Sequence, residues 1–436
     1  MTGQLTVLER KVAGRIRWSS RSIGSIILGE GFARICNLTL VIFVSRKFGV
    51  RVTGAYALAQ TLALYLMQGI DFGLRHIGAR LVASDTAVIP SVARAIQLRR
   101  TLLAIPVISL GYCYGHFGPV PSDTRTIVSL YAISMVGYAF SLDWLAWGMK
   151  RFGWVSGWRS LVSFIGAGVA ILAVELFHVG PTIIALANGV GYATAAYVLW
   201  TYWARHIWTR KGSPGLDPKS GPILRWSTIL VLGAAMIVNQ VFSSIDIIML
   251  GSLTDSTQVG LYSAAYRTLL LVLAVYYMAI ESIYPELAAI PGPQRGPHTL
   301  WRSLWKLMLI GIGITIAMEL LRRPLILMFY GAAFTASVRL SVPILISIPL
   351  ELGGAFLLTA MIAWDRSSMA LLAASAAALS NILLNFWLIP RYGAMGAAYA
   401  TPLSYGVFLI ALLVCSHKAV RSNPRLTTDS VASTCP

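Results

Sequence analysis

A short pattern occurs twice in this chain, as GAYALA at residues 54–59 and as GLYSAA at residues 260–265. The copies share Gly-x-Tyr-x-x-Ala, and each opens a long apolar run. A second, weaker pair recurs at nearly the same spacing, as HVG at 178–180 and RYG at 391–393. Duplicated sets of apolar segments are a common plan for transporters, so these stretches predict a membrane protein built from two repeated halves.

The composition agrees with a membrane protein and excludes two other classes. Of the 436 residues, 57% are hydrophobic and only 12% are charged, against about 25% charged in a soluble domain. The mean hydropathy is +0.71. So few charges could not cover the surface of a soluble enzyme of this length. The apolar content also excludes an intrinsically disordered chain.

We predict an all-α polytopic membrane protein with twelve transmembrane helices, because the chain holds twelve apolar runs that can be read as spans. Six spans form an N-terminal lobe at 1–210, a cytoplasmic linker follows at 211–225, and six more form a C-terminal lobe at 226–436 with a short cytoplasmic tail. Six is an even number, so the internal repeat is parallel. The predicted helices are 22–44, 54–75, 101–118, 126–147, 160–178, 181–203, 226–251, 260–284, 304–321, 340–363, 369–389 and 395–416.

The charge distribution predicts the orientation. The net charge is +19, and most of the 35 Lys and Arg residues lie in the loops on one side of the predicted spans. The positive-inside rule places that side, and both termini, in the cytoplasm. Basic residues beside apolar runs predict contact with membrane lipids and no nucleic-acid binding. The four cysteines and six histidines form no ligand motif, so we predict no metal site and no cofactor.

Several longer stretches carry a resemblance. VGLYSAAYR at 259–267, YPEL at 284–287 and NILLNFWLIPRYGAMGAAYAT at 381–401 lie in the second half, and RKFG at 46–49 and DFGL at 71–74 lie in the first. Together they resemble the O-antigen and exopolysaccharide flippases of bacterial inner membranes. These belong to the multidrug/oligosaccharidyl-lipid/polysaccharide exporter superfamily, which also holds the multidrug and toxin extrusion antiporters and the lipid II flippase.

The resemblance implies a two-lobed fold of twelve helices and a transporter rather than an enzyme. It implies a substrate in which an oligosaccharide is joined through pyrophosphate to a polyprenyl carrier. It also implies alternating access coupled to a gradient of H⁺ or Na⁺. The polymerase and other polysaccharide-assembly proteins become candidate partners.

Charged residues inside apolar helices are the candidates for substrate binding and ion coupling. Each costs about 2.5–3.5 kcal/mol to insert and usually faces the bundle interior. Glu30, Arg34 and Asn37 share one face of 22–44. Glu30 and Arg34 either neutralise each other or line a cavity, and these interpretations are compatible. We predict that Arg34 and Arg267 bind the pyrophosphate, because guanidinium groups match phosphate oxygens. Asn37 and Arg75 are further candidates for substrate binding, although Arg75 can also extend to the cytoplasmic interface.

Asp246 is a candidate for ion coupling, because it has no charged neighbour within one turn of its own helix. An unpaired intramembrane carboxylate can hold a proton or help to bind Na⁺. The alternative is a salt bridge to an Arg on another helix. Glu30 and Glu281 are the other candidates for coupling.

Two other functions remain open. An organic-cation antiporter of the same superfamily would share the fold, but the arginines among the deep charges favour an anionic substrate. A membrane polymerase or ligase of polysaccharide assembly would need a large outer loop or a soluble domain, and the chain has no D-x-D or P-loop motif.

Overall fold

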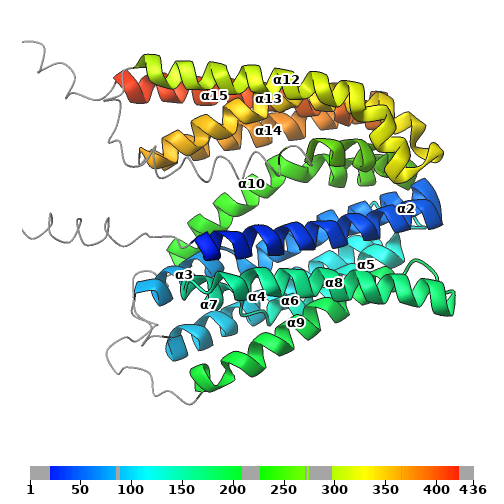
Figure 1. Cartoon of the computed structure of the whole chain (residues 1–436), viewed down its shortest axis with the longest axis vertical. Helices are drawn as coiled ribbons and strands as arrows, with labels where there is room; N and C mark the ends of the chain where they lie inside the picture. Colours follow the sequence, from blue (N-terminus) through cyan, green and yellow to red (C-terminus); the bar gives the residue numbers. More distant parts are fainter. Residues whose placement is uncertain are drawn as a thin grey trace, which may run out of the picture. The chain divides into compact units, whose positions relative to one another are not determined.

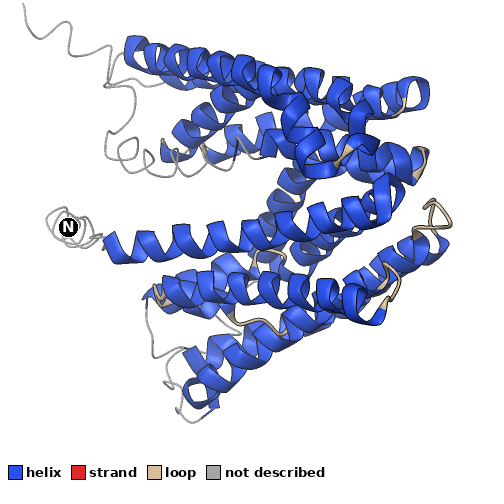
Figure 2. Ribbon diagram, turned by 45° about the vertical axis from the view of Figure 1, so that its right-hand side comes forward, coloured by secondary structure: helices blue, strands red, loops and turns tan. Residues whose placement is uncertain are grey.

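The computed structural model describes residues 20–84, 89–208, 226–270, 273, 297–364 and 366–421. All regular structure in these residues is helical, and no strand occurs among them (Figures 1 and 2). The helices are α2 (Ser20–Asp71), α3 (Leu74–Ser84), α4 (Ile89–Phe117), α5 (Arg125–Ser134), α6 (Val136–Ala139), α7 (Asp143–Gly148), α8 (Phe152–Phe177), α9 (Ile183–Trp208), α10 (Trp226–Leu253), a helix at 256–270, α12 (Pro297–Tyr330), the 3₁₀ helix η4 (Ala332–Phe334), α13 (Thr335–Ala363), α14 (Ser367–Tyr392) and α15 (Ala394–Arg421).

Eight helical stretches of the described chain are long and apolar enough to cross a membrane. The protein is therefore a multi-pass membrane protein. One of the eight, Leu28–Asp71, covers two of the predicted spans. The predicted span 101–118, except for its last residue, lies inside the longer helix α4, which is not among the eight. Most of the predicted span 260–284 lies outside the described residues.

The predicted continuous helix 126–147 is wrong. This stretch is divided among α5, α6 and α7, with breaks at Met135 and at 140–142. Met135 is a turn, and Phe140 follows α6 with a backbone that is no longer helical. The run is mostly apolar and long enough to span, so its mean hydropathy did not reveal the breaks, although Ser141 and Asp143 lie at the second one.

Three residues with positive φ shape the first helices. Gly49 has φ 77° and ψ −171° and interrupts the helical backbone of α2. Such a conformation is readily available only to glycine, and the break lies between the predicted helices 22–44 and 54–75. Phe72 and Gly73, with φ 39° and 81°, end α2 before α3 begins. The predicted helix 54–75 is therefore too long, and Arg75 lies on a different helix from Asp71.

The chain divides into two compact units. The first comprises Met1–Leu40, Gly73–Ile105 and Ser134–Ile229, and the second comprises Val41–Phe72, Pro106–Ile133 and Leu230–Pro436. In the first unit α8 packs against α9 and α7, α6 packs against α9, and α3 packs against α7. In the second unit α13 packs against α12 and α15, and α15 packs against α14.

Tryptophans form part of the core of the first unit. Trp144 and Trp203 are 0% and 1% exposed, and Trp158 is 7% exposed. Tryptophans near the ends of membrane spans often form an aromatic belt at the membrane interface. The rings of these three residues are instead enclosed by protein.

The two copies of the repeated pattern meet inside the second unit. A Cβ atom added to Gly54 would lie 1.8 Å from the backbone oxygen of Ser256 and 2.7 Å from the backbone nitrogen of Gly260. One added to Gly260 would lie 2.2 Å from the backbone oxygen of Val50. Only glycine allows two backbones to approach so closely. Each glycine of the repeat therefore lies where its helix crosses the other copy.

Candidate functional site

Arg267 lies two turns beyond this crossing, on the helix 256–270. Its Nη2 atom donates a hydrogen bond of 2.8 Å to Oε1 of Gln60, on the 50–71 arm of α2. The side chain is only partly buried. Among the described residues no carboxylate pairs with Arg267, so its positive charge is held by a neutral partner.

Gln60 connects Arg267 to the buried repeat. Its Nε2 atom donates a hydrogen bond of 2.7 Å to the hydroxyl of Tyr56, one turn earlier on the same helix. Tyr56 is 1% exposed, and its ring lies edge-on to Tyr131 with centroids 6.1 Å apart. The Tyr of the first repeat copy therefore anchors the amide that contacts Arg267.

Asp246 of α10 is a buried carboxylate, 3% exposed. One of its oxygens, Oδ2, accepts a hydrogen bond from the hydroxyl of Tyr262, the Tyr of the second repeat copy. That hydroxyl also lies 3.1 Å from Oγ1 of Thr401 on α15. The other carboxylate oxygen, Oδ1, has no hydrogen-bond partner in the described structure. The alternative of a salt bridge from an Arg on another helix is wrong for the described residues.

Two asparagines of α14 supply further oxygen atoms, and one of them forms a hydrogen bond with α10. Asn381 donates a 3.1 Å hydrogen bond to the carbonyl of Phe242, one turn before Asp246. Asn385 is fully buried and donates to the carbonyl of Asn381, while its own Oδ1 has no hydrogen-bond partner within the described chain. Two buried acceptor oxygens in this part of the second unit, Oδ1 of Asp246 and Oδ1 of Asn385, thus have no donor in the described structure. A bound cation can satisfy such oxygens, and a proton can satisfy the carboxylate.

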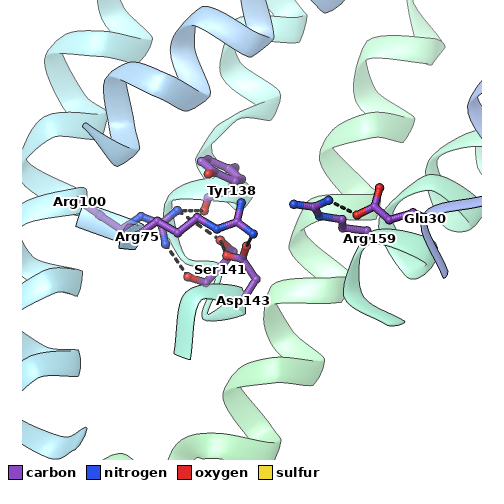
Figure 3. Close-up of polar contacts among 7 residues, drawn as sticks. All are labelled: Glu30, Arg75, Arg100, Tyr138, Ser141, Asp143 and Arg159. Carbon is purple, nitrogen blue, oxygen red and sulfur yellow. Dashed lines mark hydrogen bonds and ion pairs between the residues drawn. The ribbon is translucent and has the colours of Figure 1, made fainter. Parts of the chain in front are cut away.

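Glu30 is paired, but not with its helical neighbour. Its carboxylate forms an ion pair with Arg159 of α8 (Figure 3). The predicted pair of Glu30 with Arg34 is therefore wrong. Arg34 is exposed and makes no hydrogen bond or ion pair to the described residues. Asn37 donates a 3.1 Å hydrogen bond to Oγ of Ser163, also on α8.

Arg75 belongs to a buried polar cluster of the first unit. Its Nη2 atom lies 3.2 Å from Oδ2 of Asp143, whose side chain is 2% exposed. Arg100 is fully buried and donates to the carbonyls of Ser141 and Tyr138 at 2.6 and 3.2 Å. Figure 3 shows both guanidinium groups directed at the segment that carries Tyr138, Ser141 and Asp143. The cluster connects α3 and α4 to the 138–143 segment, and Arg75 is directed at Asp143.

The structure does not gather all the predicted site residues in one unit. Arg34, Asn37 and Arg75 belong to the first unit, and Arg267 and Asp246 belong to the second. Glu281 lies outside the described residues.

Sequence reasoning missed several polar residues. Gln60 and Arg159 were missed because neither stood out as a charge deep in a predicted span. A usable signal existed for Glu351, a charge inside the apolar run 340–363 that proves to be 4% exposed. Tyr266 lies within electrostatic reach of both Glu351 and Asp246.

Comparison with known proteins decides the family. The sequence model of the family described as "Polysaccharide biosynthesis protein" matches residues 19–290, well over half of the chain. The chain belongs to this family. The resemblance found in the sequence is thereby confirmed. No curated protein sequence matches the chain.

Solved structures show the fold. The lipid II flippase MurJ, in an inward closed conformation, has a TM-score of 0.67 at 17% identity, covering 90% of this chain and 87% of MurJ. An inward-facing multidrug resistance MATE family transporter of the MOP superfamily has a TM-score of 0.63 at 15% identity, covering 93% and 96%. The MATE transporter VcmN of Vibrio cholerae has a TM-score of 0.61 at 13% identity, covering 93% and 97%. The chain thus has the fold of these flippases and transporters.

Proposed function

We propose that this protein is a flippase that moves oligosaccharides linked to polyprenyl pyrophosphate across the bacterial inner membrane by alternating access. The observation that carries the proposal is the state of Arg267. In a member of a polysaccharide biosynthesis family, a partly buried arginine is held by an amide and keeps its charge. An arginine placed in this way suits an anion that arrives with the substrate.

Arg267 and Arg34 are the proposed ligands of the pyrophosphate, because each guanidinium presents several N–H donors to phosphate oxygens. Asn37 and Arg75 are the weaker candidates. The hydrogen bond of Asn37 to Ser163 and the ion pair of Arg75 with Asp143 would have to be exchanged or shared when substrate binds.

We assign the coupling ion, H⁺ or Na⁺, to Asp246. Its orphaned Oδ1 supports this role, since a bound proton or cation would satisfy that atom. Glu30 is the weaker candidate because Arg159 already compensates its charge. Glu281 stays a candidate on the sequence alone.

The proposal retains twelve helices in two parallel lobes, 1–210 and 226–436, joined by the cytoplasmic linker 211–225. The reciprocal crossing of Gly54 and Gly260 supports the internal repeat, because equivalent residues meet each other at a two-fold axis. Both termini lie in the cytoplasm in this proposal. The polymerase and other assembly proteins would then receive the flipped product on the outer side.

A second candidate is an antiporter for organic cations. The similarity to MATE transporters and the buried carboxylate of Asp246 beside the stacked rings of Tyr262 and Tyr266 favour it. Export of ethidium from cells that express the protein would support this candidate, whereas the flippase proposal expects none.

The test of the flippase proposal is Arg267→Ala. No described carboxylate is left unpaired by this change, so we expect a loss of about 1 kcal/mol in stability, from one hydrogen bond. The protein should reach the membrane at normal levels and fail to restore surface polysaccharide to a deletion strain. Arg267→Lys keeps the charge without the planar fork and should restore part of the activity. Full activity of Arg267→Ala would remove Arg267 from the site.

A further inference from the structure

We propose that Gln60 is a positioning residue for the substrate phosphate, which orients the guanidinium of Arg267 without neutralising it. This inference rests on the proposed function, since it names the residue that prepares Arg267 for an anion. Gln60 is not assigned a direct contact with the substrate.

The geometry places Gln60 between a fixed anchor and the cation. Its amide oxygen accepts from Nη2 of Arg267 at 2.8 Å, and its amide nitrogen donates to the hydroxyl of Tyr56 at 2.7 Å. Tyr56 is 1% exposed and cannot move without disturbing the core. The amide is therefore held in one orientation, and its oxygen fixes one edge of the guanidinium.

The Gln60 amide differs from a carboxylate in having no charge to neutralise Arg267. A carboxylate at this position would hold Arg267 equally well but would cancel its charge, and an anionic substrate would then have to displace it. An amide oxygen fixes the direction of the guanidinium and leaves its full charge for a phosphate. Arg267 also keeps further N–H donors beyond the one that Gln60 accepts.

The repeated pattern does not require this residue. The position 206 residues after Gln60 is Tyr266, whose hydroxyl donates to the carbonyl of Ser243 at 3.1 Å. The residue equivalent to Arg267 in the first copy is Thr61, whose hydroxyl bonds to the carbonyl of Ala57 on its own helix. The Gln60–Arg267 contact thus departs from the repeat at both ends, as expected of a contact that serves function.

The competing explanation is that Gln60 only joins two helices, as polar side chains often do in membranes. Gln60→Glu separates the two explanations. Glutamate has nearly the same shape and can accept from both Arg267 and the Tyr56 hydroxyl, so a joining role would survive the change. A positioning role would not, because the new ion pair neutralises Arg267.

The experiment measures binding of farnesyl pyrophosphate, a short polyprenyl pyrophosphate, to the purified full-length protein, with farnesol as the probe that lacks phosphate. Thermal unfolding of each variant without a probe is measured in parallel. We expect Gln60→Glu to weaken binding of farnesyl pyrophosphate about tenfold or more, with unchanged or higher thermal stability. Gln60→Met, which removes both hydrogen bonds, should weaken binding less.

Gln68→Glu is the matched control, because it adds the same charge to the same helix about 12 Å further along. It should bind the probe like the unchanged protein. Normal binding by Gln60→Glu, while Arg267→Ala fails to bind, would overturn the role of Gln60 and leave the proposed function intact. Normal binding by Arg267→Ala, or equal binding of farnesol, would overturn both.

Discussion

The crossing of the two repeat copies yields a sharp prediction for Gly54→Ala. The substitution adds one methyl group at the point where the arm 50–71 of α2 meets the helix 256–270. The new Cβ would lie 1.8 Å from the backbone oxygen of Ser256 and 2.7 Å from the backbone nitrogen of Gly260. Both obstacles are backbone atoms, so no rotation of a side chain can relieve the clash.

The cost follows from this distance. A Cβ atom essentially never approaches a heavy atom closer than 3.0 Å, so the two helices must separate by more than about 1 Å at this point. Overpacking of this kind costs about 1–3 kcal/mol, and a clash with backbone belongs at the upper end. The higher helix propensity of alanine offsets up to about 1 kcal/mol of this loss of stability. We expect a net loss of about 1–2 kcal/mol.

The assay is the heat stability of the detergent-solubilised protein, followed by fluorescence-detected size-exclusion chromatography. Gly168→Ala in α8 is the matched control, because a Cβ there meets nothing within 4 Å. We expect Gly54→Ala to melt several degrees below the unchanged protein and Gly168→Ala to melt at the same temperature or higher. Equal melting of the two variants would refute the close crossing.

Three further predictions concern ionisable residues. Asp246→Asn should keep a partner for Tyr262 and leave the protein assembled, but transport should no longer respond to an imposed H⁺ or Na⁺ gradient; retained coupling would exclude Asp246. Burial raises the pKa of Asp123, but hydrogen bonds from Arg51 and Ser256 outweigh it and hold that pKa below its usual value. The ion pair of Asp123 with Arg51 therefore stabilises the protein above about pH 4, and this stabilisation is lost as the pH falls further. Asp123→Asn should abolish this loss of thermal stability at acid pH. A double-mutant cycle in the same melts should couple Glu30 to Arg159 by about 0.5–1 kcal/mol, and a comparable coupling between Glu30 and a different residue would contradict the observed pair.

Local features of the fold could be predicted from the sequence. The break at Gly49 and the turn at Gly393, with φ of 77° and 55°, were signalled by glycines that end apolar runs. The burial of Asp246 followed from its place in a long apolar helix. In each case the residues that determine the feature lie within a few positions of it in the sequence.

Partners of the polar residues could not be predicted, because they come from distant parts of the chain. Glu30 pairs with Arg159 rather than with Arg34 one turn away, and Asp246 receives its hydrogen bond from Tyr262 on the next helix. Helical spacing reports which residues share a face and does not report what lies opposite that face. The same limit explains why Gln60, a neutral residue, was not predicted to contact Arg267.

The most direct test of the proposed flippase is the sidedness of the lipid-linked repeat units in a strain that lacks the gene and has no paralogue. A membrane-impermeant glycosidase, added to intact spheroplasts and to opened membranes, reports which side carries the sugar. We predict that the units accumulate and resist the glycosidase in spheroplasts, become sensitive when the membranes are opened, and return to the outer side when the unchanged gene is restored. Units that reach the outer side normally in the deletion strain would contradict the account.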